Sequence, residues 1–270
     1  VTVYTSKPEL FSLELSIVDE TGNVSLSGEI YSATNSPQVA FSEAELILIT
    51  VPPYMMEDVS RIVEQNAPWG VLIGLIPGTG GAECMFGNTL RKGAVLFGIQ
   101  RVPSVARLVS YGKEVSCLGY RKELHIAAIP AQATSYCCDL VSKLFDINCV
   151  SLPNYLNVTL TPSNAILHTT RLRTIFSDYR KGRTYTKLPL FYEDWDDDSS
   201  RLLLECDDEI QNLCRAIDGF DLSYVKSLKS HYESRNAEEL SLKLQNINSL
   251  KGLKTPAIDL GGYYVPDFSS

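Results

Sequence analysis

Asn164 and His168 are the two residues of this 270-residue chain whose types and spacing best suit proton transfer. They stand four positions apart, a spacing that places two side chains on one face of a helix. Pro162, just before them, suits a helix start because it fixes φ and gives up no needed N–H. An imidazole titrates near neutral pH, so this face is predicted to carry a general acid or base. The alternative is a structural histidine that its neighbours satisfy.

A glycine-rich turn, Pro77-Gly78-Thr79-Gly80-Gly81, follows an apolar stretch that ends at Ile76. Glycines let a ligand come close to the backbone, and the N–H groups of a following helix attract anions. The turn lacks the third glycine of the G-x-G-x-x-G fingerprint, and no acidic residue ends a strand about twenty positions later. We therefore interpret Gly78, Thr79 and Gly80 as part of a ligand crevice at a strand end, in preference to a pyrophosphate cradle.

Thr5, Ser6 and Lys7 end the first strand pattern. If that strand is the second strand of a Rossmann sheet, its end meets the ribose of an adenosine cofactor. An acidic residue there would bind the 2′-hydroxyl of NAD, whereas hydroxyls and a lysine suit the 2′-phosphate of NADP. The expected cofactor is thus NADP, with NAD as the alternative. An ordinary polar turn is the other interpretation.

Four cations surround the last strands of the first half, and an arginine can bind a carboxylate through two parallel hydrogen bonds. They are Arg101, Arg107, Arg121 and Lys122, and the sequence alone does not choose among them. Seven cysteines without a C-x-x-C pair, together with only three histidines, predict no metal site. Free thiols fit a cytoplasmic protein.

The hydrophobic pattern divides the chain into an α/β half and a helical half. Strands are predicted at residues 1–4, 11–18, 24–26, 45–51, 69–76, 94–99, 115–118, 125–129 and 148–152, with helices at 54–65, 82–91 and 131–145. The later helices are predicted at 162–179, 195–217, 223–233 and 238–247, and residues 251–270 are predicted to be irregular. Continuous apolar runs indicate a parallel sheet covered on both faces. We predict an α/β domain over residues 1–152 and an all-α domain over residues 153–270.

Bulk composition fits a soluble globular protein, with 44% hydrophobic and 21% charged residues. The net charge of -8 argues against a nucleic-acid partner. No run approaches the ~18 apolar residues of a membrane span. The first residues are interpreted as a strand already under way, with neither a signal peptide nor an initiator methionine. We expect a cytoplasmic protein.

Five segments, in order along the chain, resemble the opine dehydrogenase family, which includes octopine and nopaline dehydrogenases. They are residues 45–52 (ELILITVP), 76–81 (IPGTGG), 100–107 (QRVPSVAR), 111–119 (YGKEVSCLG) and 159–168 (TLTPSNAILH). The asparagine–histidine motif is the most specific of them. The family usually has proline after this histidine, where Thr169 stands here.

The resemblance implies a Rossmann-like domain followed by an α-helical substrate domain of the 6-phosphogluconate dehydrogenase C-terminal-like kind. It implies an NAD(P)-dependent oxidoreductase acting on CH–NH bonds, which condenses an amino acid amine with a 2-oxo acid and reduces the imine. His168 would be the catalytic acid/base, and Asn164 would help to place the substrate. Thr50, Val51 and Pro52 would line the cofactor cleft with the Gly78–Gly81 turn, and we assign Arg107 and Gly81 to the substrate.

Two departures from the family matter. The chain opens on what resembles the family's second strand, so either it is a fragment or this half cannot cradle pyrophosphate in the ordinary way. The family also has a carboxylate that orients the histidine, in a segment resembling Arg-Tyr-x-x-Glu-Asp. Asp267 lies about where spacing would place it, although Gly262 replaces the arginine. We favour the interpretation that residues 266–270 lead into that segment, and we keep Asp267 as a candidate.

Two rival functions remain open at this level. One is a 2-hydroxy acid dehydrogenase of the 6-phosphogluconate dehydrogenase type, which would need no amine. The other is a non-catalytic relative that has lost its cofactor site. The expected partners are amino acid and 2-oxo acid substrates, without nucleic acid or membrane, and a homodimer is compatible with this interpretation.

Overall fold

The computed structural model describes residues 1–19, 21–78, 80–161 and 164–267. The chain forms two compact units, Val1–Pro162 and Ser163–Ser270. The short helix α6 (Leu156–Thr159) lies within the first unit, and the domain boundary predicted at residue 152 stays a prediction. None of the described helices combines the length and apolar character needed to cross a lipid bilayer.

Three parallel strands lie side by side at one edge of a five-stranded sheet in the first unit. Ile47 lies beside Ile73, and Ile73 lies beside Leu96. Ile73 and Leu96 are fully buried, as expected for apolar runs covered on both faces. The three strands are β5 (Leu46–Ile49), β6 (Leu72–Leu75) and β7 (Val95–Ile99).

Two further strands complete this sheet beyond β7. β10 (Glu123–Ile129) runs antiparallel to β7, and β11 (Asn148–Ser151) pairs in parallel with β10. The predicted α/β sheet is confirmed, but it is not parallel throughout. The chain between β7 and β10 forms strands of another sheet and no crossover helix, so the strand direction can reverse.

The helices of the first unit follow the predicted alternation, with one break. The predicted helix over residues 82–91 is two short helices separated at Phe86, whose ring is fully buried. Cys137, Cys138 and Val141 of the last long helix pack into the core of the five-stranded sheet. The elements are α2 (Met56–Asn66), α3 (Ala82–Met85), α4 (Gly87–Arg91) and α5 (Thr134–Phe145), with 3-10 turns at Pro8–Leu10, Pro53–Met55 and Ala131–Ala133.

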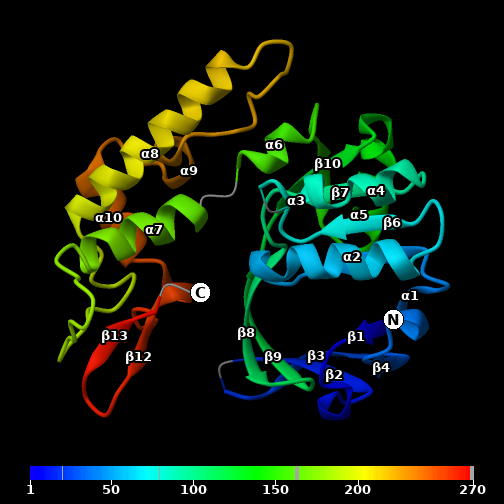
Figure 1. Ribbon diagram of the computed structural model, residues 1–270, viewed down its shortest axis with the longest axis horizontal. Helices are drawn as coiled ribbons and strands as arrows, with labels where there is room; N and C mark the ends of the chain where they lie inside the picture. Colours follow the sequence, from blue (N-terminus) through cyan, green and yellow to red (C-terminus); the bar gives the residue numbers. More distant parts are fainter. Residues whose placement is uncertain (20, 79, 162–163, 268–270) are drawn as a thin grey trace. The chain divides into compact units, whose positions relative to one another are not determined.

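A second sheet of four strands, in the order β3-β2-β9-β8, lies at the foot of this unit in Figure 1. The prediction missed β8 (Ser104–Ser110), which pairs with β9 (Glu114–Tyr120) as a hairpin. β3 (Val24–Glu29) is an edge strand with every residue exposed, and it pairs with β2 (Glu14–Val18).

The first strand of the chain does not pair with the five-stranded sheet among the described residues. β1 (Thr2–Tyr4) pairs in parallel with β4 (Ser32–Thr34), which the prediction missed together with α1 (Pro37–Phe41). These two missed segments are short, and a strand of three residues leaves little periodicity to detect. The end of β1 nevertheless carries Thr5, Ser6 and Lys7, as predicted.

The second unit is built on four helices whose apolar faces meet around Trp195, Leu203 and Leu240. Asp196 and Asn236 cap two of them by accepting the backbone N–H of Ser199 and Glu239. The helices are α7 (Asn164–Ile175), α8 (Asp197–Ala216), α9 (Leu228–Tyr232) and α10 (Ala237–Gln245), with a 3-10 turn at Asn248–Leu250. The four predicted helices are therefore present, although the predicted start at Pro162 lies outside the described residues.

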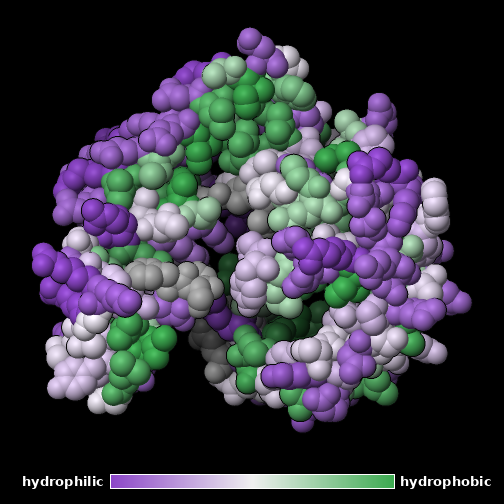
Figure 2. All heavy atoms as spheres, in the orientation of Figure 1, coloured by the Kyte–Doolittle hydropathy of each residue, from purple (hydrophilic) through white to green (hydrophobic). Residues whose placement is uncertain are grey.

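The tail that was predicted to be irregular contains a β-hairpin. β12 (Ala257–Asp259) pairs antiparallel with β13 (Tyr264–Pro266), and the Asp259 carboxylate accepts the N–H groups of Gly261 and Gly262 in the turn. Both glycines have positive φ, which suits such a tight turn. Ile258 and Leu260 are exposed, and the hairpin carries a green, hydrophobic patch in Figure 2.

Candidate functional site

The carboxyl ends of β5, β6 and β7 bring two predicted segments to one edge of the sheet. Thr50, Val51 and Pro52 follow β5, and the glycine turn follows β6. The N–H of Gly78 donates to the Ile99 carbonyl at the end of β7, at 2.7 Å. Ligands of open α/β sheets bind at this edge, so the local geometry suits the predicted cofactor cleft. Thr79 lies outside the described residues.

Helix α6 packs directly on this glycine turn. A Cβ atom on Gly78 would lie 2.1 Å from Val158 Cγ1, and one on Gly80 would lie 2.9 Å from the Thr159 carbonyl oxygen. The sequence suggested that these glycines open the backbone to a ligand, but α6 already uses the space where their side chains would be. Gly81 has a positive φ of 79° at the start of α3, a conformation that favours glycine. A role of the turn in cofactor binding stays a prediction.

A carboxylate lies beside the glycine turn, in the first turn of α3. One oxygen of Glu83 accepts the hydroxyl of Thr159 at 2.5 Å, and the other is buried without a hydrogen-bond partner among the described residues. The nearby Tyr155 hydroxyl is buried in the same way, and burial together with the charge of Glu83 raises the pKa of Tyr155. A negative charge here disfavours a second negative charge, which supports the preference against a pyrophosphate cradle.

At the predicted ribose site, at the end of β1, the Thr5 hydroxyl already has hydrogen-bond partners within the protein. The Thr5 hydroxyl lies 3.0 Å from the Tyr111 hydroxyl, and the Lys7 backbone N–H donates to Thr5 Oγ1. The side chains of Ser6 and Lys7 are exposed. A hydroxyl and an ammonium group therefore remain open to solvent at this strand end.

The two residues assigned to the substrate come from different sheets. Arg107 lies half-buried on β8, opposite Ser116 of the four-stranded sheet, whereas Gly81 follows β6 of the five-stranded sheet. Arg121 donates to the Val102 carbonyl and so stabilises its own loop. Arg107 as a substrate ligand stays a prediction.

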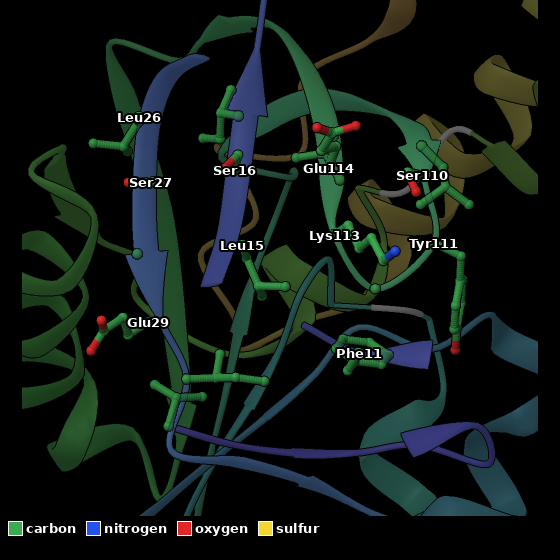
Figure 3. Close-up of a pocket in the computed structure, with 17 residues that line it drawn as sticks. Phe11, Leu15, Ser16, Leu26, Ser27, Glu29, Ser110, Tyr111, Lys113 and Glu114 are labelled. Carbon is green, nitrogen blue, oxygen red and sulfur yellow. The ribbon is translucent and has the colours of Figure 1, made fainter. Parts of the chain in front are cut away.

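A cavity of about 460 Å³ opens on the four-stranded sheet. Figure 3 shows Leu15 and Phe11 on its wall, with Lys113 and Glu114 on the turn and strand above them. Its lining is dominated by apolar side chains. Among the described residues, none of those predicted for cofactor or substrate lines it.

His168 lies on α7 in the second unit, half-buried, with Asn164 exposed one turn before it. Its Nε2 atom is 3.2 Å from the Tyr192 hydroxyl, and its ring meets Phe191 edge to face at a centroid distance of 5.5 Å. Burial lowers the pKa of the imidazole, because the charged form loses solvation. His168 is therefore neutral at neutral pH.

Arg171 lies one turn beyond His168 on α7 and was missed by the sequence reasoning. Its side chain is 1% exposed, and it donates to the carbonyls of Phe191 and Asp194 and to the Asp196 carboxylate. These three residues belong to the loop that carries Tyr192. The i, i+3 spacing to His168 was visible in the sequence, but the partners more than 18 residues away were not.

The candidate carboxylate partner of His168 lies directly after β13. Asp267 is half-buried, and its backbone N–H donates to the Pro256 carbonyl. Its role beside His168 stays a prediction. Within the described part of the chain, no group of three or more histidine, cysteine or acidic side chains is placed to hold a metal ion.

Comparison with known proteins bears directly on the second unit. Residues 151–260 match the family model described as the α-helical domain of NAD/NADP octopine/nopaline dehydrogenase. The chain resembles the opine dehydrogenases. This confirms the family resemblance predicted from the five motifs.

Two curated relatives and one solved structure give the extent of the likeness. An octopine dehydrogenase of Mizuhopecten yessoensis is 25% identical over 88% of this chain and 63% of its own length. An uncharacterized protein, y4xO of Sinorhizobium fredii, is 29% identical over 72% of this chain and 54% of its own length. The chain thus spans about half to two-thirds of the length of these two relatives.

The solved structure is octopine dehydrogenase in complex with NADH and agmatine, with a TM-score of 0.78 at 21% identity. It is covered over 72% of its length by the whole of this chain. The likeness shows the fold: a Rossmann-like sheet domain and an α-helical domain.

Proposed function

We propose that this chain supplies the cofactor cleft and the acid/base histidine of an NAD(P)H-dependent opine dehydrogenase. The observation that carries the proposal is the half-buried His168 on α7, inside the segment that matches the octopine/nopaline dehydrogenase domain. The proposal does not specify which amine and which 2-oxo acid are the substrates. Structures of octopine dehydrogenase with NADH hold L-arginine or pyruvate, which supports an amino acid and a 2-oxo acid as the substrate classes.

The residues present fit part of a nicotinamide dinucleotide. Exposed Ser6 and Lys7 would hold the adenosine ribose or its 2′-phosphate, and Thr50–Pro52 with the glycine turn would line the cleft. The pyrophosphate is assigned to no residue here, since the 270 residues contain no G-x-G-x-x-G turn and Glu83 adds negative charge. When bound, the cofactor supplies the hydride.

Neutral His168 suits the first proton transfer of the condensation. A substrate ammonium must lose a proton before its nitrogen can attack the carbonyl carbon, and a neutral imidazole can accept that proton. The imidazolium can then return the proton to the hydroxyl that leaves as water when the imine forms. Asn164, on the same helix face, would hold the substrate by hydrogen bonds.

Replacing His168 by alanine tests this proposal in the full-length protein. Turnover of NAD(P)H with a panel of amino acids and 2-oxo acids should fall by about 10²- to 10⁴-fold, the usual contribution of general acid–base catalysis. Nucleotide binding, followed by cofactor fluorescence, should stay unchanged. His231→Ala is the matched control, because His231 lies on α9 in the same unit. Near-normal turnover of His168→Ala would refute the assignment.

A second candidate is a 2-hydroxy acid dehydrogenase. The fold is also similar to D-mandelate dehydrogenase, with a TM-score of 0.53 at 10% identity. Such an enzyme would reduce a 2-oxo acid without any amine. Assaying the full-length protein with the 2-oxo acid alone separates the two functions.

A further inference from the structure

The edge strand β3 of the four-stranded sheet has one side open to further backbone pairing. Among the described strands it pairs with β2 alone, and its six residues are all exposed. The turn that leads into it is held by the Asp19 carboxylate, which accepts the N–H groups of Thr21 and Asn23. The strand is therefore presented in a defined position, and its outer N–H and C=O groups point to where another strand would lie.

The pairing register collects polar side chains on one face of this sheet. Glu14 lies opposite Glu29, while Ser16 lies opposite Ser27 on one side and Glu114 on the other. Residues that pair directly across two strands project from the same face. The three carboxylates and the two hydroxyls therefore share one face, at and beside the open edge.

The residues that alternate with these polar ones are apolar. Leu15 lies opposite Gly28, and Ile17 lies opposite Leu26. All four line the cavity of about 460 Å³, and Figure 3 shows Leu26 on β3 with Leu15 on the neighbouring strand. A Cβ atom on Gly28 would meet nothing within 4 Å, so the space beside this glycine is open. A strand added next to β3 would place a side chain there.

The charge of this region is one-sided. Residues 8–60 contain nine aspartates and glutamates and no lysine, arginine or histidine. Lys113 lines the cavity from the turn between β8 and β9, but β2 separates that hairpin from β3. Glu14 and Glu29 face each other directly, and such a like-charge pair destabilises a sheet. A pair that the fold carries at a cost in stability indicates a surface whose charge serves another purpose.

This charge selects the kind of chain that suits the open edge. A second copy of the protein would bring the same acidic stretch against it, and like charges repel. A basic segment would instead place its cations beside Glu14 and Glu29. An extended conformation would satisfy the outer backbone groups of β3, and its alternation would direct apolar side chains toward the cavity.

We propose that β3 binds an extended basic segment of a partner protein as a fifth strand of this sheet. Lysine or arginine side chains of the partner lie against Glu14 and Glu29, and an apolar side chain enters the cavity beside Gly28. Backbone pairing supplies the affinity, and the two faces supply the specificity. The surface lies on a different sheet from the glycine turn and on a different unit from His168, so it goes beyond the proposed function.

Three synthetic peptides of eight residues test the proposal on the full-length protein. The first alternates lysine and valine, the second has glutamate for each lysine, and the third keeps the lysines but has proline at a central valine. By fluorescence anisotropy, the first should bind at least about tenfold more tightly than the others, because it alone combines the complementary charge with a backbone that can pair. It should also slow hydrogen exchange of the amides of residues 24–29.

Glu29→Lys tests the charge on the strand itself. It should weaken binding of the lysine peptide by about three- to tenfold, since an exposed ion pair contributes little and the change turns attraction into repulsion. The variant should unfold at a slightly higher temperature, because an ion pair with Glu14 replaces the like-charge pair, so weaker binding would not come from unfolding. Combining it with Glu14→Lys should reverse the preference toward the glutamate peptide.

Glu43→Lys is the matched control. Glu43 is exposed in the same acidic stretch, but it follows α1 and lies outside the four-stranded sheet. Because it makes the same change in net charge away from β3, it should leave the Kd of the lysine peptide within about twofold. An equal effect of Glu43→Lys and Glu29→Lys would show that the peptide senses only the net charge of the protein, and would overturn the proposal.

The remaining outcomes are equally decisive. Equal binding of the lysine peptide and either of the other two, or protection confined to elements other than β3, would overturn the proposal. Protection of residues 24–29 that grows with protein concentration in the absence of peptide would assign the edge to a second copy, and would also overturn it. None of these measurements uses turnover, so they stand whether or not His168 has the role proposed above.

Discussion

His168 and Arg171, three residues apart on α7, have opposite surroundings. Arg171 is held by carbonyls and a carboxylate on several sides, whereas the His168 ring meets one phenol oxygen, at 3.2 Å. A side chain that must gain and lose a proton benefits from few strong bonds, because each bond favours one protonation state. The arginine next to it supplies the rigidity that the histidine itself lacks.

The choice of cofactor can be tested at a single residue, Lys7. Its ammonium group is exposed at the end of β1, where the 2′-phosphate of NADP is expected. In the full-length protein, Lys7→Glu should raise the KM for NADPH by about tenfold or more and leave that for NADH within about twofold, since a charge reversal acts on the phosphate alone. Initial rates with both nucleotides measure this.

Lys143→Glu is the control for that experiment. Lys143 is exposed near the end of α5 and carries the same charge, so it should leave both KM values as they are. A wild-type preference for NADH, or an unchanged KM for NADPH in Lys7→Glu, would contradict the assignment.

Residue types at fixed spacing were enough to single out Asn164 and His168, because both lie on one helix face and spacing determines that face. Tyr192 and Arg171 were out of reach. Their partners are separated from them by irregular segments of the chain. Tyr192, for example, lies 24 residues after His168. No periodicity encodes a contact of that kind, so the partner of the imidazole could only be found in three dimensions.

Among the elements, α6 has an influence out of proportion to its four residues. It packs against Gly78, Gly80 and Gly98, the last of which lies on β7. The apolar runs predicted β5, β6 and β7 correctly because burial on both faces leaves a plain pattern. The same pattern did not show why β7 contains a glycine, which depends on Tyr155 and Val158 from far along the chain.

Gly98→Ala should therefore destabilise the first unit by about 1–3 kcal/mol, the usual cost of overpacking a core. The new methyl group would lie 2.6 Å from the Tyr155 hydroxyl oxygen and 2.8 Å from Val158 Cγ1. Thermal unfolding, followed by circular dichroism and by the reactivity of the buried Cys137 thiol of the first unit, measures the loss.

Gly87→Ala is the matched control on α4. A Cβ atom there meets only the Arg91 side chain at 3.9 Å, so the change should be neutral or should stabilise the helix by up to about 1 kcal/mol. Equal stability of the two variants would show that α6 tolerates displacement from β7.

At the scale of the molecule, each unit contains one of the two tryptophans. Trp69 is 79% exposed in the first unit, and Trp195 is 1% exposed in the core of the second. The change in tryptophan fluorescence on unfolding should thus report the second unit. The change in hydrophobic pattern near residue 152 led us to predict an α/β domain and a helical domain, because strand and helix periods differ. The sequence analysis did not predict the β12–β13 hairpin, because each strand has only three residues.

Arg171→Ala should lower the stability of the second unit by about 3 kcal/mol or more, because the change leaves buried carbonyls and Asp196 without their donor. The Trp195 transition should move to lower denaturant concentration, while the exposure of the Cys137 thiol in the first unit should not. Arg173→Ala, an exposed arginine of the same helix, should leave both transitions in place. A matching shift in Arg173→Ala would mean that the effect comes from α7 in general.

The unpaired edge of β3 predicts how the protein aggregates at high concentration. Val24 and Leu26 are 59% and 60% exposed on a strand that pairs with β2 alone among the described strands, so its outer backbone groups can pair with another chain. At high concentration, association between chains should therefore involve this edge. Leu26→Lys would place a charge on this edge and should reduce aggregation of the protein at high concentration.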